Sequence, residues 1–497
     1  MQSAQPLLKS KMFWVGILYF AQGFPLGAFY EIFPVYFRQH GVDLRDIGAL
    51  SLLGLSWTLK FLWAPAIDFF RHHRRWMFFA DLCMGAVMLF FAAHSGFGPA
   101  TWVAIGIFTF LSATNDSAID GYTIEFLEKR ELGLANGLRI GFYRVGMLAS
   151  GVILILSDYI SWHGAYLTAA LILVASGLSC LSAPKEKIVS RTKTLSLAQE
   201  FKDIFLHPFA FAAVLGLLLG ALWLVNRETR WSAVVPYFWP LALAAAGGLM
   251  AFSLGARAIA APALRREAGA DLLTRGPMFG ALLEMLQRPH IVPVLIFILI
   301  FKLADSSMGF MIKPFWVDAG FSNTEIGLVS VNIGLVLSIA GGVAGGWFTD
   351  RVGIFKSLWL LGLLQAVSNL GYAYAAYVLP TVPHGAAIAI PLAHKALVYS
   401  ASALESFTGG LGTAAFLAFL MAIVDKKHSA TEYALLSSVF AMSRSFAGWA
   451  GGYGAQSMGY APYFLLTFLL AFPAYALLPW VKKMLAYAES NRHWGET

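Results

Sequence analysis

The sequence contains little charge and almost no cysteine. Charged residues make up 12% of the 497 residues, about half the share usual in a soluble domain, while hydrophobic residues make up 58% and the mean hydropathy is +0.68. Cys83 and Cys180 both lie in apolar runs, which argues against a disulfide framework and a cysteine-based metal site. A Gly-x4-Gly-Lys-Ser/Thr loop and a His-Glu-x2-His pair are also lacking. We therefore expect neither an ATP-driven motor nor an enzyme, and no cofactor or metal.

Apolar runs of bilayer-spanning length recur along the whole chain. The first begins at Phe13 and continues through Gly23, Pro25 and Glu31 without a signal-peptide cleavage site. The expected spans lie near residues 13–37, 48–66, 76–94, 101–124, 135–157, 164–182, 209–225, 232–254, 291–316, 326–348, 356–378, 397–424, 431–454 and 461–481. This pattern predicts an all-α polytopic membrane protein with fourteen spans.

The distribution of basic residues predicts the orientation of the chain. Most of the 35 Lys and Arg residues fall in segments that are cytoplasmic if the N-terminus is cytoplasmic. Those in external segments are Arg38, Arg45, Arg227, Arg230 and Lys395. The net charge of +8 is thus an orientation signal and not a nucleic-acid footprint, and both termini are expected in the cytoplasm.

The two ends of the chain repeat each other. The segment from Gly41 to Gly48 matches the one from Gly320 to Gly327, each ending in Ile-Gly. The pattern Arg144-x6-Gly151 likewise matches Arg444-x6-Gly451. Such repeats build many transporters from two bundles around a central site. The expected domains are a six-helix bundle over 1–184, a linker with interfacial helices and two extra spans over 185–290, a second six-helix bundle over 291–484, and a tail over 485–497.

Two basic turns after corresponding spans are candidates for a gate. Asp68 precedes Arg71 and Arg74, and Asp350 precedes Arg351. The second turn, Gly346-Trp-Phe-Thr-Asp350-Arg-Val-Gly353-x2-Lys356, resembles the signature loop of the major facilitator superfamily, whereas the first lacks its leading glycine. Ion pairs at these helix ends, joined by Arg139, would break and reform as the bundles rock. The alternative is a simple positive-inside anchor.

Charged residues within the spans are functional candidates because burying them in lipid is costly. Asp116 and Asp120 lie one helical turn apart. Their depths match those of Arg144 and Arg139, which suggests the pairs Asp116–Arg144 and Asp120–Arg139. Such pairs have either a proton-handling or a purely structural role. The full set of proton-coupling or ion-pair candidates is Asp116, Asp120, Asp305, Glu31 and Glu405.

Further polar residues in the spans are candidates for substrate binding. Lys60 and Lys313 lie near span ends, where long basic side chains can also snorkel. The substrate-binding candidates are Arg144, Lys302, Arg444, Lys60, Asn115, Gln22, Gln365, Asn369, Tyr122 and Tyr143.

Several stretches together resemble the AmpG muropeptide permease family of the major facilitator superfamily. They are Thr114-Asn-Asp-Ser-Ala-Ile-Asp120, Tyr143-Arg-Val-Gly-Met-Leu-Ala-Ser-Gly151, Lys302-Leu-Ala-Asp305, Leu364-Gln-Ala-Val-Ser-Asn-Leu-Gly-Tyr372, Glu405-Ser-Phe-Thr-Gly-Gly-Leu-Gly-Thr-Ala-Ala-Phe416 and Ser429-Ala-Thr-Glu-Tyr-Ala-Leu-Leu436. The resemblance covers both six-span halves but not residues 209–280. The family usually has Gln-Asp where this chain has Asn115-Asp116.

This resemblance implies the major facilitator fold, here with two extra helices between its two six-helix bundles. It also implies proton-driven import of N-acetylglucosaminyl-anhydro-N-acetylmuramyl peptides across the inner membrane for peptidoglycan recycling, with an influence on β-lactamase induction. The expected partners are this sugar-peptide, protons and the lipid bilayer, for a monomer that binds no nucleic acid. The alternatives are an acetyl-CoA or siderophore permease of the same fold, or a membrane sensor that does not transport.

Overall fold

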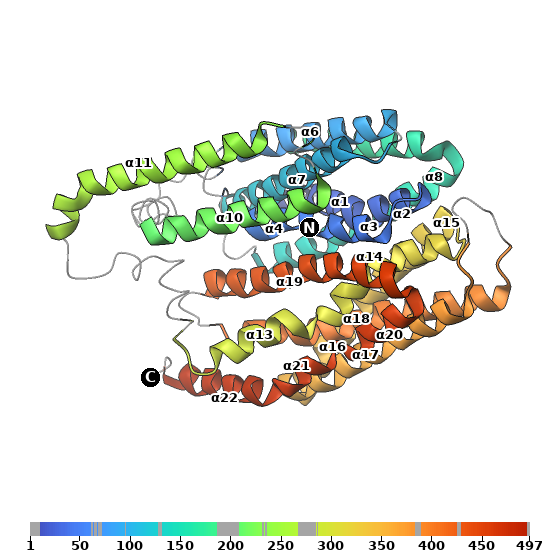
Figure 1. The fold of residues 1–497 in the computed structure, drawn as a ribbon. Coiled ribbons are helices and arrows are strands. Elements are labelled where there is room, and N and C mark those ends of the chain that lie inside the picture. The colour runs from blue at the N-terminus through green and yellow to red at the C-terminus, as the bar shows by residue number, and fades with distance from the viewer. Residues whose placement is uncertain are drawn as a thin grey trace, which may run out of the picture.

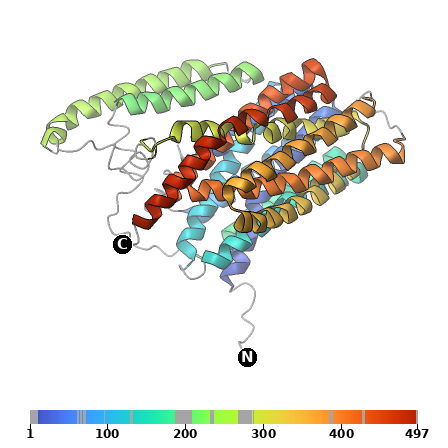
Figure 2. The ribbon, with the colours of Figure 1, turned by 90° about the horizontal axis from the view of Figure 1, so that it is seen from below.

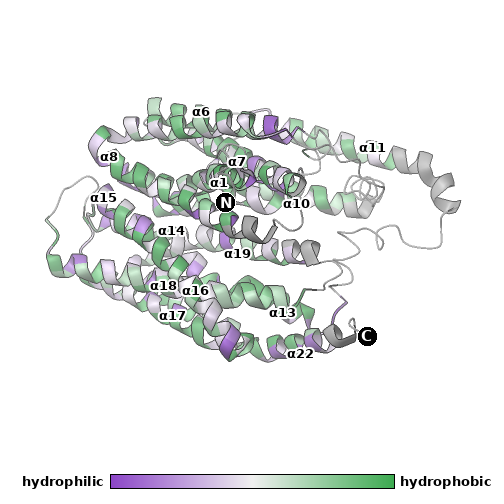
Figure 3. Ribbon diagram, turned by 180° about the vertical axis from the view of Figure 1, so that it is seen from behind, coloured by the Kyte–Doolittle hydropathy of each residue, from purple (hydrophilic) through white to green (hydrophobic). Residues whose placement is uncertain are grey.

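The computed structural model describes residues 10–60, 63, 67, 72–94, 96–127, 132–185, 208–230, 233, 236–266, 285, 287–382, 389–424 and 429–494. Within these residues all regular elements are helical, and they form an elongated bundle (Figure 1). Apolar residues predominate along the helices (Figure 3). The predicted all-α fold is confirmed.

The first half of the chain forms one bundle. Its elements are α1 (Lys11–Gly27), the π-helical turn η2 (Ala28–Ile32), α2 (Phe33–Gln39), α3 (Leu44–Leu53), α4 (Leu55–Leu59), α6 (His73–Ala93), α7 (Pro99–Phe126) and α8 (Leu132–Ser182). α8 packs against both α1 and α6. It contains two of the expected spans, because Ile160 and Ser161 leave helical geometry and Ser161 has φ 62°.

Two additional helices follow, α10 (Pro208–Thr229) and α11 (Phe238–Arg266). They lie side by side at the edge of the bundle (Figures 1 and 2), and α10 packs against α3. Glu228 of α10 accepts a hydrogen bond from the Tyr453 hydroxyl at 2.7 Å. The expected interfacial helices near 198–208 and 281–289 fall largely outside the described residues.

The second half forms the other bundle. Its elements are α13 (Ile291–Phe301), α14 (Leu303–Asp318), α15 (Asn323–Glu325), the π-helical turn η7 (Ile326–Ile333), α16 (Gly334–Val352), α17 (Ile354–Val378), α18 (Leu392–Ala422), α19 (Ser429–Met458), α20 (Tyr460–Leu469), α21 (Phe472–Ala476) and α22 (Leu478–Trp494). α18 packs on α16 and α17, and α19 packs on α14. α22 continues past residue 484, where the expected tail begins.

Several helices have the length and composition to cross a membrane. Within the described residues there are eight such stretches, or nine if the bent pair Tyr460–Ala476 and Leu478–Ser490 is one span. Leu138–Ser182 of α8 counts as one of them although it contains two expected spans. The chain is thus a multi-pass membrane protein, and the count of fourteen stays a prediction.

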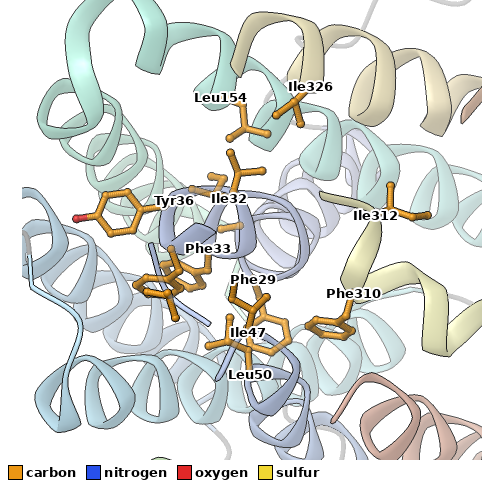
Figure 4. Close-up of a cluster of buried hydrophobic side chains, with 14 of the residues drawn as sticks. Phe29, Ile32, Phe33, Tyr36, Ile47, Leu50, Leu154, Phe310, Ile312 and Ile326 are labelled. Atoms are coloured by element: carbon orange, nitrogen blue, oxygen red, sulfur yellow. The ribbon is translucent and has the colours of Figure 1, made fainter. Parts of the chain in front are cut away.

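The two halves share one apolar core at one end of the molecule. We define the closed end as the region around residues 39–44, 157–161, 318–324 and 456–460, at the right of Figure 1. There Phe29 lies near Phe310, and Leu154 lies near Ile326 (Figure 4). Toward the opposite end each half has a core of its own, around Tyr122 in the first half and Phe416 in the second.

Polar contacts also join the halves at the closed end. Asp318 accepts two hydrogen bonds from Arg38, at 2.7 and 2.6 Å, and another from the Tyr460 hydroxyl at 2.6 Å. Asn323 donates to Ser157 at 2.7 Å and accepts from Gln39 at 2.6 Å. A bidentate guanidinium–carboxylate pair is among the stronger polar contacts, so this network and the shared core hold the closed end together.

Close glycine contacts align the helices at this interface. A Cβ at Gly48 of α3 would lie 2.6 Å from Cα of Gly452 of α19. A Cβ at Gly151 of α8 would lie 2.9 Å from the carbonyl oxygen of Gly327 of η7. Gly48, Gly151 and Gly327 each end one of the matching sequence segments, and Gly452 directly follows Gly451 of the fourth, so the matching segments occupy related places where the halves meet.

Candidate functional site

A cavity of about 350 Å3 lies between the two halves. The first half contributes Tyr30, Glu31 and Met147 to its wall, and the second half contributes most of the remaining residues. Six charged side chains line it: Glu31, Lys302, Asp305, Lys313, Glu405 and Arg444. Three acids and three bases thus face one space within the membrane bundle.

Local irregularities of the helices carry several of these side chains. Lys302 separates α13 from α14, with φ −98° and ψ 10°, and Asp305 lies in the first turn of α14. The π-helical turn η2 carries Glu31, and η7 carries Ser330, which also lines the cavity. Interrupted helices and π-helical turns are frequent at binding sites.

Two of the three basic side chains in the cavity wall have acidic partners. Lys313 Nζ lies 2.9 Å from Glu31 Oε2 and donates to the Ser330 hydroxyl at 2.6 Å. Lys302 Nζ donates to Gln365 Oε1 at 2.8 Å and lies 3.5 Å from Asp305 Oδ2. Lys313 is 7% exposed, so it does not snorkel as its place near a span end suggested. It instead joins the two halves across the cavity.

Arg444 and Glu405 have no oppositely charged partner within 4.0 Å among the described residues. The Arg444 guanidinium lies over the Tyr30 ring at 4.2 Å from its centre, a cation–π contact that leaves its N–H groups available. Glu405 accepts only a 3.3 Å hydrogen bond from Ser406. The cavity therefore offers one unpaired cation and one unpaired carboxylate to a ligand.

A second charged cluster lies in the first half, toward the end opposite the closed end. Asp116 pairs with Lys60, and Asp120 pairs with Arg139 at 3.1 Å. Tyr19 donates a hydrogen bond to Asp120 at 3.0 Å. The expected pair Asp120–Arg139 is confirmed. The expected pair Asp116–Arg144 is wrong, because depth in the membrane does not fix the direction in which a helix points its side chain.

The other substrate-binding candidates lie outside the cavity wall. Gln365 lies directly beside the wall, because its Oε1 accepts a hydrogen bond from the cavity residue Lys302 and its Nε2 would lie 3.9 Å from a Cβ built at the cavity residue Gly409. Asn115 donates to Asp81 at 2.8 Å, Asn369 donates to Thr467 at 3.2 Å, and the buried Tyr122 donates to the carbonyl of Pro184 at 2.9 Å. Gln22 is buried, and Tyr143 and Arg144 are half-buried. For Asn115, Asn369 and Tyr122 these contacts favour a packing role.

Two of the described gate candidates, Arg74 and Arg351, make contacts within their own halves. Asp68 and Arg71 lie outside the described residues. Arg74 donates to the carbonyl of Leu181, and Arg351 lies over Trp347 at 4.2 Å from the ring centre. Asp350 is exposed. The polar network described above between the two halves lies instead at the closed end.

Sequence reasoning missed two acidic residues with important contacts. Asp81 is fully buried between α6, α7 and α8, where Asn115 donates to one oxygen and the Cys180 sulfur lies 3.8 Å from the other. Asp318 connects Arg38 and Tyr460 at the closed end. Asp81 could have been found from the sequence, because it is an aspartate within the apolar run 76–94. Asp318 could not, because it lies after the span that ends at 316 and is therefore not a charge within an apolar run.

Among the described residues, no group of three His, Cys, Asp or Glu side chains is placed to hold a metal ion. The cavity charges instead suit an organic ligand with polar and charged groups.

Several proteins with similar sequences are named as permeases or putative transporters. The chain is 25% identical to the "Anhydromuropeptide permease" of Escherichia coli, over 96% of this chain and 80% of that protein. It is 22% identical to the "Putative transporter AmpG 4" of Rickettsia conorii, over 94% and 95% of the two chains. An "Uncharacterized protein" of Haemophilus influenzae is 27% identical, over 93% and 92%. The similarity to AmpG permeases predicted from the sequence is confirmed.

Solved structures and a family profile agree on the fold. The nucleoside transporter NupG has a TM-score of 0.61 at 13% identity, over 95% of this chain and 98% of that one. A POT family transporter in complex with 5-aminolevulinic acid has a TM-score of 0.64 at 11% identity, over 95% and 96%. The profile of the Major Facilitator Superfamily matches residues 15–393. From this match and the two-bundle architecture, the chain belongs to the Major Facilitator Superfamily.

Proposed function

We propose that this protein imports anhydromuropeptides, the N-acetylglucosaminyl-anhydro-N-acetylmuramyl peptides, through the inner membrane by alternating access. The observation that carries the proposal is the charged cavity between two halves that are held together at the closed end. The similar proteins named for anhydromuropeptide or AmpG transport support this choice of substrate.

The orientation of the chain gives this structure a place in the transport cycle. If both termini are cytoplasmic, as the basic residues predict, the closed end faces the periplasm. The structure then represents the inward-facing state. Release of the substrate to the cytoplasm follows in this state, and loading requires the contacts at Asp318 and Asn323 to break.

We further propose that transport is coupled to protons. Three acids, Glu31, Asp305 and Glu405, line the cavity. Two more, Asp116 and Asp120, lie in the second charged cluster. Carboxylates that can bind and release protons are therefore available both in the cavity and in the first half. A carboxylate in a desolvated site binds a proton more readily than one in water. Arg444 would hold a carboxylate of the substrate.

Acetyl-CoA fits the cavity less well than an anhydromuropeptide. Acetyl-CoA carries several phosphates and calls for a dense cluster of unpaired cations, whereas Lys302 and Lys313 already have acidic partners. A siderophore permease and a non-transporting sensor would share the fold, and fold alone does not determine function. Ligand binding tests the first alternative, and a transport measurement tests the second.

Binding to the purified full chain tests the substrate assignment. Labelled anhydromuropeptide should bind, and Arg444→Gln should weaken binding by about ten- to a hundredfold, the range expected when a charge-assisted hydrogen bond is lost. Lys482→Gln is the matched control, because Lys482 is exposed and lies over Phe355, away from the cavity. Failure of the unmodified protein to bind anhydromuropeptide, with clear binding of acetyl-CoA or a siderophore, would contradict the proposal.

A further inference from the structure

Three polar atoms from three helices converge on Gly409 of α18. A Cβ built at Gly409 would lie 3.8 Å from Glu405 Oε1, 3.9 Å from Gln365 Nε2 and 4.0 Å from Asp305 Oδ1. Gly409, Asp305 and Glu405 all line the central cavity. The absence of a side chain at position 409 thus leaves room for a ligand atom in front of these three groups.

The Gln365 amide is held in one orientation and leaves a donor unused. Its Oε1 accepts a hydrogen bond from Lys302 Nζ at 2.8 Å, which fixes the oxygen toward the lysine because two donors would otherwise face each other. Gln365 is 6% exposed, and its Nε2 has no hydrogen-bond partner among the described residues. A buried donor without an acceptor is costly, so this amide group is available to an acceptor atom of a ligand.

The two carboxylates present unused acceptors at the same place. Lys302 lies nearest to Oδ2 of Asp305, and Ser406 donates to Oε2 of Glu405. The oxygens nearest Gly409 are the other ones, Oδ1 and Oε1. Neither of them has a hydrogen-bond partner within the described part of the chain.

One donor and two acceptors together select the chemistry of the ligand. An anion would be repelled by the two carboxylates, and a bare cation would face the N–H group of Gln365. A hydroxyl group both donates and accepts, and neighbouring hydroxyls of a sugar can serve two carboxylates at once. We propose that Asp305, Gln365, Glu405 and the space at Gly409 form a subsite, the Gly409 subsite, for hydroxyl groups of the sugar part of the substrate.

This inference rests on the proposed function and adds an orientation to it. The sugars lie against α14, α17 and α18 at the Gly409 subsite. The carboxylate of the substrate lies toward Arg444 of α19, which lines the same cavity.

Gly409→Ala tests the subsite without removing any charge. The new methyl group makes ordinary van der Waals contacts at 3.8–4.0 Å, and alanine is favoured over glycine inside a helix, so the fold should be retained. Gly342→Ala of α16 is the matched control, because its Cβ meets nothing within 4 Å and it lies outside the cavity wall. The experiment measures how well peptide-free disaccharide, or free stem peptide, displaces labelled anhydromuropeptide that is bound to the purified full chain.

We expect Gly409→Ala to weaken displacement by the disaccharide by about tenfold, as the loss of one or two hydrogen bonds predicts. Displacement by the peptide and all results for Gly342→Ala should stay unchanged. Equal disaccharide affinity in Gly409→Ala and the unmodified protein would overturn the subsite. A variant with equal disaccharide affinity in which only the pH dependence of uptake shifts would also overturn it, because that result is expected of a proton-binding site. If the unmodified protein binds no anhydromuropeptide, the proposed function fails and the subsite fails with it.

Discussion

At the residue scale, most of the charged side chains within the described membrane helices are matched in pairs. Lys60 pairs with Asp116, Arg139 with Asp120, and Lys313 with Glu31. Such pairing lowers the cost of placing charge in a membrane bundle. Arg444 and Glu405, which lack such partners in the described residues, are therefore the cavity charges best suited to act on a ligand or a proton.

The Lys60–Asp116 pair gives a prediction at this scale. Removing one partner of a buried pair costs about 3–5 kcal/mol, but the Lys60 side chain is 30% exposed, so we expect Asp116→Asn to cost about 1–2 kcal/mol. It should lower the thermal midpoint in detergent and abolish uptake. The double variant Lys60→Met with Asp116→Leu should recover the thermal midpoint but not the uptake.

Two results would contradict this account of the pair. A double variant as unstable as the single one would show that the pair does not form. Unchanged uptake by Asp116→Asn would remove Asp116 from the transport mechanism.

At the scale of elements, helices of one half meet helices of the other through paired glycines. α3 meets α19 at Gly48 and Gly452, and α8 meets η7 at Gly151 and Gly327. Small residues allow such close approach between membrane helices. Because these contacts lie in the interface that closes one end, they must separate when the cavity opens to that side.

Gly48→Ala should therefore favour the state in which the closed end is open. Its Cβ would lie 2.6 Å from backbone Cα of Gly452, a distance that only helix separation relieves. We expect a longer distance between spin labels at the exposed positions His40 and Thr381, together with reduced uptake. Gly342→Ala, whose Cβ meets nothing within 4 Å, is the control. An unchanged distance in Gly48→Ala would refute the role of this contact.

The sequence predicted the helical fold, the two related halves and the presence of charges in the bundle, because apolar run length, repeats and misplaced charges are properties of the chain alone. It did not predict which charges meet. The Asp116–Arg144 pair failed because helix rotation is set by packing, and Lys60 lies where Asp116 points. The break at Lys302 has no glycine or proline beside it, and the unpaired Nε2 of Gln365 follows from tertiary contacts only.

At the scale of the whole molecule, the two halves share an apolar core and a polar network at the closed end. Toward the opposite end of the molecule, each half has a separate core. The charged cavity lies between them. This is the arrangement expected of one state of an alternating-access transporter, in which two bundles rock about a central site. The extra helix α10 packs against α3 and α11 packs against α10, and neither helix contributes to the cavity wall.

Uptake of labelled anhydromuropeptide into proteoliposomes containing the purified protein is the most direct test of the central claim. With an inward proton gradient, we predict accumulation above the external concentration, and its loss when a protonophore collapses the gradient. Uptake no greater than in protein-free liposomes, or equal with and without the gradient, would contradict a proton-coupled anhydromuropeptide importer.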